Sequence, residues 1–473
     1  MKVLSVILSA VMIFTLFAGI VSVDVSASGA LIGDIDKDGA ITVSDALHIL
    51  RACAGLKNYD ESEIPIYDVW SDGAIGVEDA LGVLRSSIGI IGSFGKLGVK
   101  FTFTPNADAV SLGLNQGMVD RGVLSYEGSS RVAKVMSKAA AGESITIATL
   151  GGSITQGTGA ESTVNRYANR VYSWWKKNFP QSDVKFQNAG IGATGSLYGV
   201  HRVDEHVLAY NPDFLIIEYA VNDRDAGTAE TYENLVRKVL KNSPDTAVLL
   251  LFMTDMYYND KQDEEAEIGE LYDLPMISYR NAIKDEIESR RITWPEISPD
   301  YDGLHPNDRG HGLVAGLVNS YLDGVKRVYE DCSQIVPGIP EAKYGERYIE
   351  ASMYWCNEDF DVDSMGSFIV DDYYHHGKTG SWYVKNGISP LTFEIRGRNI
   401  MLLHEMNVDQ NKSGIIKVAI DRKSPVSVDS YFRNGWGNYL VVTPVMTNGT
   451  NKVHTVKITP TSGTFRIAAI LVS

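Results

Sequence analysis

A serine follows an apolar, strand-like run in the middle of the chain. Residues 144–150 (Ser-Ile-Thr-Ile-Ala-Thr-Leu) are rich in β-branched side chains, which predicts a buried strand of a parallel sheet. Gly151 and Gly152 then allow a sharp turn, and Ser153 lies just past the carboxyl end of the strand, where open α/β sheets place their binding crevices. A serine there can be a nucleophile if other segments supply a base and an oxyanion site. Taken alone, the stretch also fits an ordinary glycine-rich turn.

Three further polar or glycine-rich segments follow predicted strands or precede a predicted helix. They are residues 188–196 (Asn-Ala-Gly-Ile-Gly-Ala-Thr-Gly-Ser), 218–223 (Glu-Tyr-Ala-Val-Asn-Asp) and 302–306 (Asp-Gly-Leu-His-Pro). With residues 151–154, and in this order, they resemble the four sequence blocks of the SGNH (GDSL-type) hydrolases. The resemblance covers about residues 127–332. It implies a three-layer, flavodoxin-like α/β domain with a parallel sheet.

The resemblance also implies a role for each polar residue. Ser153 is expected to be the nucleophile, His305 the general base, and Asp302 the group that orients the imidazole. The oxyanion hole is expected to combine the Ser153 backbone N–H, a backbone N–H of the second block and the Asn222 side-chain amide. These residue types suit acyl transfer, because an imidazole accepts the serine proton and each fixed donor stabilises the tetrahedral intermediate by about 2.7–4 kcal/mol.

Two positions depart from the family pattern. The first block reads Gly-Gly-Ser-Ile where the family has Gly-Asp-Ser-Leu, which changes the residue before Ser153 and keeps the hydroxyl. In the second block, the glycine of the family aligns with Gly192 or with Ala193. We favour Gly192, although either residue is chemically suitable because the donor is a backbone N–H.

Other polar residues near these blocks are interpreted as structural. His311 is expected to pack or to lie on the surface, and Asp223 and Asp225 are expected to form a solvated turn. His201 and His206 lack the accompanying cysteines or carboxylates of a zinc site.

Acidic residues recur at fixed spacing in two loops nearer the N-terminus. Counting from Asp34, oxygen-bearing side chains fall at positions 1, 3, 5, 9 and 12, with glycine at position 6; they are Asp34, Asp36, Asp38, Thr42 and Asp45. This is an EF-hand type of calcium loop, since Ca²⁺ takes six to eight oxygen ligands and the glycine permits the tight turn. Thirty-four residues on, the pattern recurs with Asp68, Asp72 and Asp79, but with Trp70 at position 3. An indole offers no oxygen ligand, so we expect weaker or vestigial calcium binding there.

Each loop leads into a predicted helix, and an internal duplication of this kind is far less expected by chance than a single match. The pair resembles a type I dockerin over about residues 30–92, the module that docks cellulosomal enzymes onto the cohesin domains of a scaffold protein. The resemblance implies structural Ca²⁺ and a cohesin partner. Loop positions 10 and 11, which help to choose the cohesin in that family, are Val43-Ser44 and Val77-Glu78. Their difference argues against symmetric dual-mode binding.

The first 27 residues have the pattern of a secretory signal. Lys2 supplies a positive start, residues 3–23 an apolar core, and Val25-Ser26-Ala27 a small-residue cleavage site. An uncleaved membrane anchor is the alternative interpretation. No later run is apolar for long enough to span a bilayer, so we expect a secreted, extracellular protein without a membrane partner.

Composition narrows the partners further. The net charge of −16 argues against nucleic-acid binding. Three cysteines are too few for a disulfide framework, and a Cys332–Cys356 bridge stays open.

The remaining organisation follows from hydrophobic periodicity. After a dockerin over 28–92, residues 93–126 are expected to form a linker and N-terminal extension, with a short strand near 100–105. Short apolar strands then alternate with amphipathic helices over 127–332, which predicts a parallel sheet covered on both faces. The predicted strands are 144–150, 184–188, 214–219 and 247–253, and the predicted helices are 130–139, 164–179, 200–209, 228–242, 275–291 and 307–329.

Residues 333–473 change to short alternating runs separated by glycine and asparagine turns. About nine strands at this spacing predict a β-sandwich, with a jelly roll as one form of it. Its aromatic residues could bind carbohydrate or form the core; they are Trp355, Tyr373, Tyr374, Trp382, Tyr383, Tyr431 and Trp436.

Together, these patterns predict an exported, dockerin-bearing serine esterase of the SGNH class. It is expected to remove ester groups, most readily acetyl groups, from acylated plant cell-wall polysaccharides such as xylan. The reaction would pass through an acyl-Ser153 intermediate without a cofactor for catalysis. The substrate rests on the resemblances. The alternative is a non-catalytic, glycan-binding cellulosomal component with a relic hydrolase domain; a glycosidase ranks third, since no pair of carboxylates facing one bond stands out.

Overall fold

The computed structural model describes residues 29–224, 227–299, 303–356 and 361–473. The predicted secretory signal, Asp225 and Asp302 lie outside these ranges. The chain divides into two compact units, one ending at Val99 and the other beginning at Lys100. Among the described residues, none of the helices combines the length and the hydropathy that a bilayer span requires.

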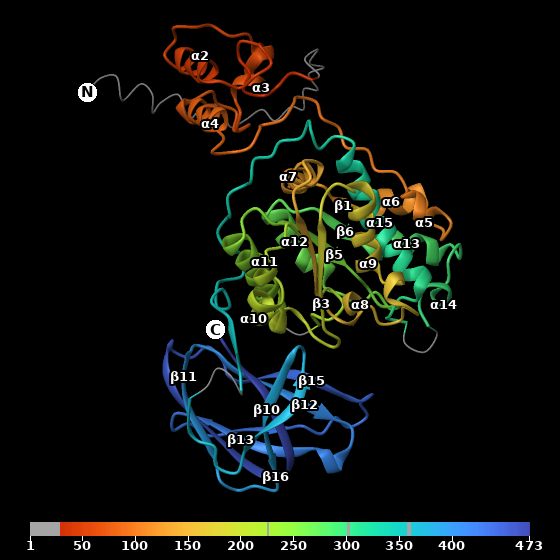
Figure 1. Ribbon diagram of the computed structural model, residues 1–473, viewed down its shortest axis with the longest axis vertical. Helices are drawn as coiled ribbons and strands as arrows, with labels where there is room; N and C mark the ends of the chain where they lie inside the picture. The colour runs from red at the N-terminus through yellow and green to blue at the C-terminus, as the bar shows by residue number, and fades with distance from the viewer. Residues whose placement is uncertain (1–28, 225–226, 300–302, 357–360) are drawn as a thin grey trace, which may run out of the picture. The chain divides into compact units, whose positions relative to one another are not determined.

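The first unit is built from two loop-and-helix repeats (Figure 1). Helices α2 (Val43–Cys53) and α4 (Val77–Ser87) follow the two acidic loops, as predicted, and α3 (Ile64–Tyr67) lies between them. Thr42 begins α2 as its N-cap, and its hydroxyl accepts a hydrogen bond from the Ser44 N–H. This contact satisfies one of the N–H groups that every helix leaves unpaired at its start.

A six-stranded sheet forms the centre of the second unit, in the order β1-β6-β5-β4-β2-β3. The strands are β1 (Val123–Ser125), β2 (Ile145–Gly151), β3 (Val184–Gly190), β4 (Phe214–Glu218), β5 (Ala247–Phe252) and β6 (Met276–Ser278). Strands β2 to β6 are parallel, but β1 pairs antiparallel with β6, so the sheet is mixed where we predicted a parallel one. Residues 107–125, expected to form an extension, supply this edge strand together with α5 (Ala107–Val110) and α6 (Gln116–Gly122).

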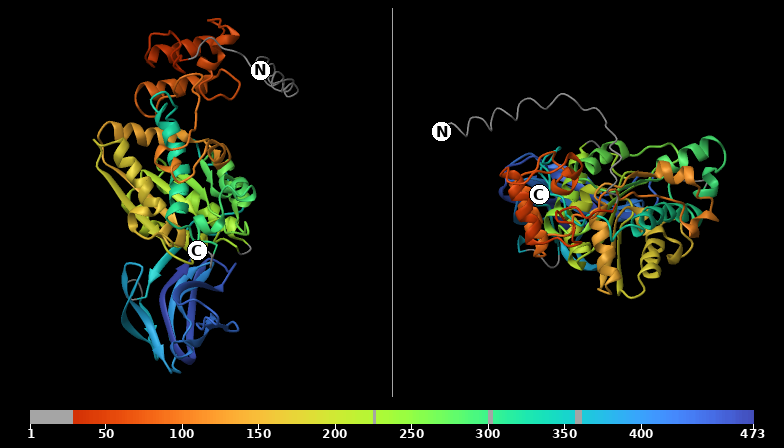
Figure 2. Two further views of the ribbon diagram at one scale, coloured as in Figure 1. Left: turned by 90° about the vertical axis from the view of Figure 1, so that its right-hand side faces the viewer. Right: turned by 90° about the horizontal axis from the view of Figure 1, so that it is seen from above.

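Helices cover both faces of the sheet (Figures 1 and 2). The helices are α7 (Ser129–Ala140), α9 (Tyr167–Asn178), α10 (Ser196–His206), α11 (Thr228–Asn242), α12 (Gln262–Leu271), α13 (Tyr279–Glu288), α14 (Trp294–Ile297) and α15 (Asp308–Lys326). Apolar residues of α10, α11 and α12 form one buried cluster with side chains of β2, β4 and β5. On the other face, Trp175 of α9 packs on Phe214 of β4. Burial on both faces explains why these strands read as continuous apolar runs.

Three segments of the second unit differ from the prediction. The range 275–291, expected to be one helix, begins with strand β6 and continues as α13, because a three-residue apolar strand has no period of its own. Residues 100–105 form no strand, whereas helix α12 lies in a range where none was predicted.

The C-terminal part of the second unit is antiparallel β structure, as predicted. Its strands are β7 (Ser352–Trp355), β8 (Val362–Ser364), β9 (Ile369–His375), β10 (Lys378–Lys385), β11 (Leu391–Gly397), β12 (Ile400–Asn407), β13 (Gly414–Ile420), β14 (Val426–Asp429), β15 (Asn438–Met446) and β16 (Lys452–Val472). The runs 453–458 and 465–472, which the sequence pattern predicts as separate strands, form one strand, β16. Its first part pairs with β11 and β13, and its second part pairs with β7, β10 and β12. Side chains from both groups of strands share one buried cluster.

The aromatic residues of this domain divide between core and surface. Trp355 and Trp382 are only 2% and 1% exposed and belong to the core, whereas Trp436 and Tyr374 are 73% and 67% exposed. All three cysteines are described and none forms a disulfide, so the Cys332–Cys356 bridge is absent.

Candidate active site

Ser153 lies at the turn between β2 and a short helix. Strand β2 ends at Gly151, and Ser153 is the first residue of α8 (Ser153–Gln156). The Ser153 Oγ lies 2.8 Å from His305 Nε2, a hydrogen bond between residues 152 positions apart. A serine hydroxyl bonded to an imidazole is the arrangement that nucleophilic catalysis requires.

His305 is held by the segment that leads into α15. Its backbone carbonyl accepts a hydrogen bond from the Ser298 hydroxyl at 2.9 Å. Two residues later, the Asn307 side chain caps α15 by accepting from the N–H groups of Arg309 and Gly310. The ring is therefore positioned by a helix start and a loop contact. Asp302 lies outside the described residues, and its orienting role stays a prediction.

Asn222 packs directly against the serine turn. A Cβ atom built at Gly152 would come within 2.3 Å of Asn222 Oδ1. The amide thus occupies the space that a side chain at position 152 would need, which accounts for glycine where the family pattern has aspartate. Asn222 Oδ1 is buried, with no hydrogen-bond partner among the described residues.

The second block brings Gly192 next to Ser153. A Cβ at Gly192 would lie 3.7 Å from Ser153 Cβ, so this residue is adjacent to the serine. Its N–H, however, donates to Gln156 Oε1 at 3.1 Å. The next residue, Ala193, has a φ of +59°, a left-handed conformation that favours glycine. The conformation favours Ala193 as the position of the family's glycine, and the choice between Gly192 and Ala193 as the second oxyanion donor stays a prediction.

A buried glutamate supports the serine turn from behind. Glu218, at the end of β4, accepts a hydrogen bond from Thr155 Oγ1 at 2.8 Å, and the Tyr167 hydroxyl lies 2.7 Å from the same Thr155 oxygen. Burial raises the pKa of Glu218 to about 8, opposed by the Thr155 hydroxyl and by the nearby N–H groups of Gly152 and Thr155, which favour the charged carboxyl. The carboxyl therefore holds Thr155, two residues after Ser153.

A buried arginine connects three strand ends. Arg202 of α10 donates to the carbonyl of Ala189 at 2.7 Å, to that of Gly151 at 3.2 Å and to the Tyr219 hydroxyl at 2.9 Å. These partners belong to the ends of β3 and β2 and to the residue after β4. Sequence reasoning missed Arg202 and Glu218; the available signal was one charged residue among the apolar positions of a helix and another at the end of an apolar strand.

Asp223 differs from the solvated turn that we predicted. It is 2% exposed, and its Oδ1 accepts from the Ser196 N–H at 2.8 Å, so it ties the second block to the third. A Cβ at Gly195 would lie 2.3 Å from the same oxygen, which explains the glycine there.

The other histidines have structural partners. His311 is buried, its Nδ1 accepts from the Tyr167 N–H at 3.3 Å, and its Nε2 lies 3.1 Å from the Thr158 carbonyl. Burial lowers the pKa of His311 to about 4, which keeps it neutral. His201 Nδ1 bonds to the Leu197 carbonyl, and His206 Nδ1 lies against Arg202. Neither belongs to a group of metal-ligand side chains among the described residues.

The acidic loops of the first unit differ in their capacity for a cation. In the first loop, carboxylate oxygens of Asp34, Asp36 and Asp38 lie within 4.8 Å of one another, which fits a hard cation. Within the described ranges, no other set of acidic, histidine or cysteine side chains meets this criterion, the second loop included. Thr42 and Asp45 are hydrogen-bonded to each other at 3.0 Å beside the first loop.

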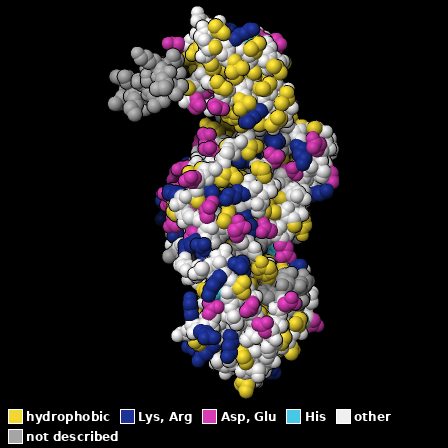
Figure 3. Space-filling view, turned by 90° about the vertical axis from the view of Figure 1, so that its left-hand side faces the viewer, with side chains coloured by type: hydrophobic (Ala, Val, Ile, Leu, Met, Phe, Trp, Pro, Cys, Tyr) yellow, Lys and Arg dark blue, Asp and Glu magenta, His cyan; other side chains and the backbone are white. Residues whose placement is uncertain are grey.

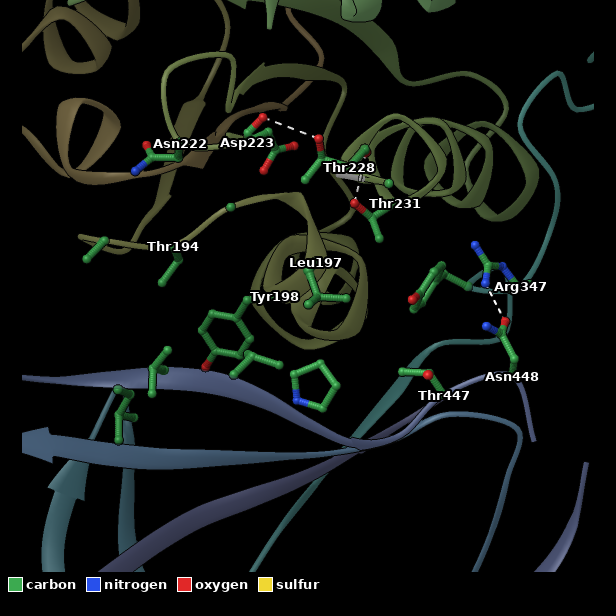
Figure 4. A pocket seen from close by; sticks show the side chains of 18 residues that line it. Thr194, Leu197, Tyr198, Asn222, Asp223, Thr228, Thr231, Arg347, Thr447 and Asn448 are labelled. Carbon is green, nitrogen blue, oxygen red and sulfur yellow. Dashed lines mark hydrogen bonds between the residues drawn. The ribbon is translucent and has the colours of Figure 1, made fainter. Parts of the chain in front are cut away.

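A cavity of about 500 Å³ begins at Asn222, next to the serine turn. One wall comes from the second and third blocks and from α11, and the opposite wall from β15 and the turn after it (Figure 4). Hydroxyl, amide and guanidinium groups line it, from Thr194, Tyr198, Thr228, Thr231, Arg347 and Asn448. Arg347 bonds to Asn448 across the two domains and to Glu230 of α11. Such convergent polar groups suit a polyhydroxylated ligand.

Comparison with known proteins identifies the central domain. Residues 149–313 match the GDSL-like lipase/acylhydrolase family. The chain is 33% identical to the structure of a two-domain esterase active on acetylated mannans, with a TM-score of 0.69; the match covers 75% of this chain and 98% of that one. A second structure with the same description, co-crystallised with mannopentaose, is 34% identical with a TM-score of 0.68, and the match covers 75% of this chain and 97% of that one. No curated protein matches the chain significantly.

The pKa of Glu218 predicts how stability depends on pH. Because the folded-state pKa lies near 8 and the ordinary value is 4.5, the folded chain holds a proton there that the unfolded chain loses. The stabilisation is complete below pH 4.5 and is lost as the pH rises through about 8. Burial and nearby carboxylates raise the pKa of Glu265, which gives the same sign. We expect the melting temperature to fall across this window.

The matched variants are Glu218→Gln, which keeps an acceptor for Thr155, and the exposed Glu394→Gln as control. Calorimetry at several pH values should show a shallower fall for Glu218→Gln than for the control. An equal fall of melting temperature with pH in the two variants would contradict the raised pKa of Glu218.

Proposed function

Because the chain belongs to the GDSL-like lipase/acylhydrolase family, and is a carboxylic ester hydrolase, we propose that it removes acetyl groups from plant cell-wall polysaccharides, acetylated mannans foremost. The observation that carries the proposal is the 2.8 Å contact between Ser153 Oγ and His305 Nε2. The esterase active on acetylated mannans supports mannan as the substrate class, ahead of the xylan that the sequence alone suggested.

In the proposed reaction, His305 Nε2 accepts the proton of Ser153 Oγ while this oxygen attacks the acetyl carbonyl carbon. The carbonyl oxygen becomes an oxyanion, which the Ser153 N–H, a backbone N–H of the second block and the Asn222 amide would stabilise. The protonated imidazole then gives its proton to the departing sugar oxygen, which leaves acetyl-Ser153. Water, deprotonated by His305, attacks this ester and releases acetate and the free serine.

The cavity beside Asn222 is the proposed place for the polysaccharide. It adjoins the serine turn, and both of its walls carry hydrogen-bond donors and acceptors (Figure 4). Since β15 and the turn after it form one wall, the β domain would contribute to substrate binding directly.

Substitution at the site tests the reaction. Ser153→Ala should lower kcat on a chromogenic acetate ester by about 1,000-fold or more, because the nucleophile is lost. Asn222→Ala should lower kcat by about 100-fold, with a smaller change in KM, because the amide acts on the transition state. Ser173→Ala, on α9, is the matched control and should keep wild-type rates. Activity in Ser153→Ala equal to that of the control would leave the glycan-binding alternative.

Acetate release from natural polymers tests the substrate class. We expect a higher kcat/KM on acetylated glucomannan than on acetylated xylan at equal acetyl concentration, because the relative acts on acetylated mannans. Ser153→Ala measured on both polymers gives the background. A higher value on xylan would contradict the mannan assignment and leave the esterase reaction intact.

We further propose that the chain is exported through its N-terminal signal and that its first unit is a calcium-dependent dockerin bound to a cohesin. The close carboxylates of the first loop support the calcium site. Exposed apolar side chains, gathered on the first unit (Figure 3), support a docking face. On the two helices these are Val43, Leu47 and Leu50 of α2, and Val77 and Leu81 of α4.

Binding to a panel of type I cohesins tests this part of the proposal. Complex formation should occur in Ca²⁺ and weaken by about 100-fold or more in excess chelator, because removing the ion removes the folded loop. Leu47→Asp should abolish binding, whereas Ile388→Asp, at an exposed apolar position of the β domain, should not. No binding to any cohesin in Ca²⁺ would contradict the dockerin assignment without affecting the esterase.

A further inference from the structure

The two acidic loops of the first unit share one backbone arrangement. In the first, Asp34 Oδ1 and Oδ2 accept from the N–H groups of Asp38 and Gly39 at 3.1 and 2.9 Å. In the second, Asp68 Oδ1 and Oδ2 accept from Asp72 and Gly73 at the same distances. Position 12 likewise accepts from the N–H of position 9 at 2.8 Å in both loops. The backbones therefore do not distinguish the loops.

The side chain at position 3 does distinguish them. Asp36 of the first loop faces the other carboxylates, whereas Trp70 takes the equivalent place in the second. The Trp70 Nε1–H donates to the Glu78 carbonyl at 3.0 Å, and the indole lies edge to face with Phe94 at 5.3 Å between ring centroids. Its backbone N–H points at Asp79 Oδ1, 3.4 Å away. Trp70 thereby joins the loop to the first turn of α4.

A second substitution makes room for the indole. A Cβ at Gly82, inside α4, would lie 2.8 Å from Trp70 Cζ2. Glycine inside a helix is less stable than alanine, so it calls for a packing reason. The equivalent position in the first repeat, thirty-four residues earlier, is His48. Trp70 and Gly82 are thus a complementary pair that the first repeat lacks at both positions.

The second loop also lacks the hydroxyl at position 9, where Gly76 replaces Thr42. Its side-chain ligands reduce to Asp68, Asp72 and Asp79. This set does not fit an ion that requires six to eight oxygens.

We propose that Trp70, seated on Gly82, replaces the cation as the support of the second loop, so that the chain binds one Ca²⁺ and α4 keeps its fold without metal. The inference rests on the proposed calcium site of the first loop for the ion count, but its statement about α4 stands on the second repeat alone. It makes the two helices unequal: the fold of α2 depends on calcium and that of α4 does not.

Calcium titration of the full chain, after chelation, measures the ion count. Wild type should bind one Ca²⁺, Asp36→Ala none, and Asp72→Ala still one. Trp70→Asp restores an oxygen at position 3 and should raise the count to two. Two ions in wild type, falling to one in Asp72→Ala, would overturn the proposal, as would a count that Trp70→Asp leaves unchanged.

Hydrogen exchange on the same full-length proteins measures the support of each helix. On chelation from a Ca²⁺ concentration about 100 times the Kd, amide exchange in α2 should accelerate by about 100-fold, while that in α4 should change little. Trp70→Ala should accelerate exchange in α4 with or without Ca²⁺, and Trp70→Phe should do so less, because a ring still covers Gly82.

Equal acceleration of both helices on chelation would overturn the proposal. A wild type that binds no Ca²⁺ would contradict the calcium site of the first loop. In that case, faster exchange of α4 in Trp70→Ala would still support Trp70 as the support of the second loop, and unchanged exchange would contradict it. No step of this experiment requires a cohesin, so its failure is distinct from failure of the docking proposal.

Discussion

One buried guanidinium holds together the edge of the sheet where the candidate site lies. Arg202 bonds to carbonyls at the ends of β2 and β3 and to the tyrosine that follows β4. A charge taken fully out of water is costly unless it is hydrogen-bonded, and the three partners that converge on this guanidinium offset part of that cost. The same convergence brings the first, second and third sequence blocks together.

The serine turn is then held from two further sides. Glu218 accepts a hydrogen bond from the Thr155 hydroxyl, and Asn222 fills the space beside Gly152. The glycine at position 152 is therefore a steric requirement of this chain. A preorganised site of this kind loses little free energy to rearrangement when charge develops on a substrate oxygen.

Local pattern predicted the parts of the fold that have a clear period. Strands β2, β4 and β5 are continuous apolar runs, and α11 was predicted at its observed bounds. Strands β1 and β6 are too short to show any period, which is why the antiparallel edge was missed. The order of the sequence blocks predicted Ser153 and His305 as site residues, although only the fold shows their contact. The contacts of Arg202, Glu218 and Gln156 span strands and helices that no local window connects.

The sequence also could not show which residues of one type are buried and which are exposed. Trp382 and Trp436 both lie in the β domain, but Trp382 is part of the core and Trp436 is largely exposed. Asp223 followed a strand in a segment that reads as a turn, yet it is buried because Ser196 approaches it from another element. In both cases the deciding neighbour is distant in sequence.

The long strand β16 has a consequence for how the C-terminal domain is made. It pairs with β7, β10, β11, β12 and β13, all of which precede it in the chain. These strands leave the ribosome with open edges, and none of them can close the domain before residues 452–472 emerge. Closure of the domain therefore waits for β16, and a nascent chain interrupted before β16 would expose several unpaired edges at once, the form most prone to aggregation.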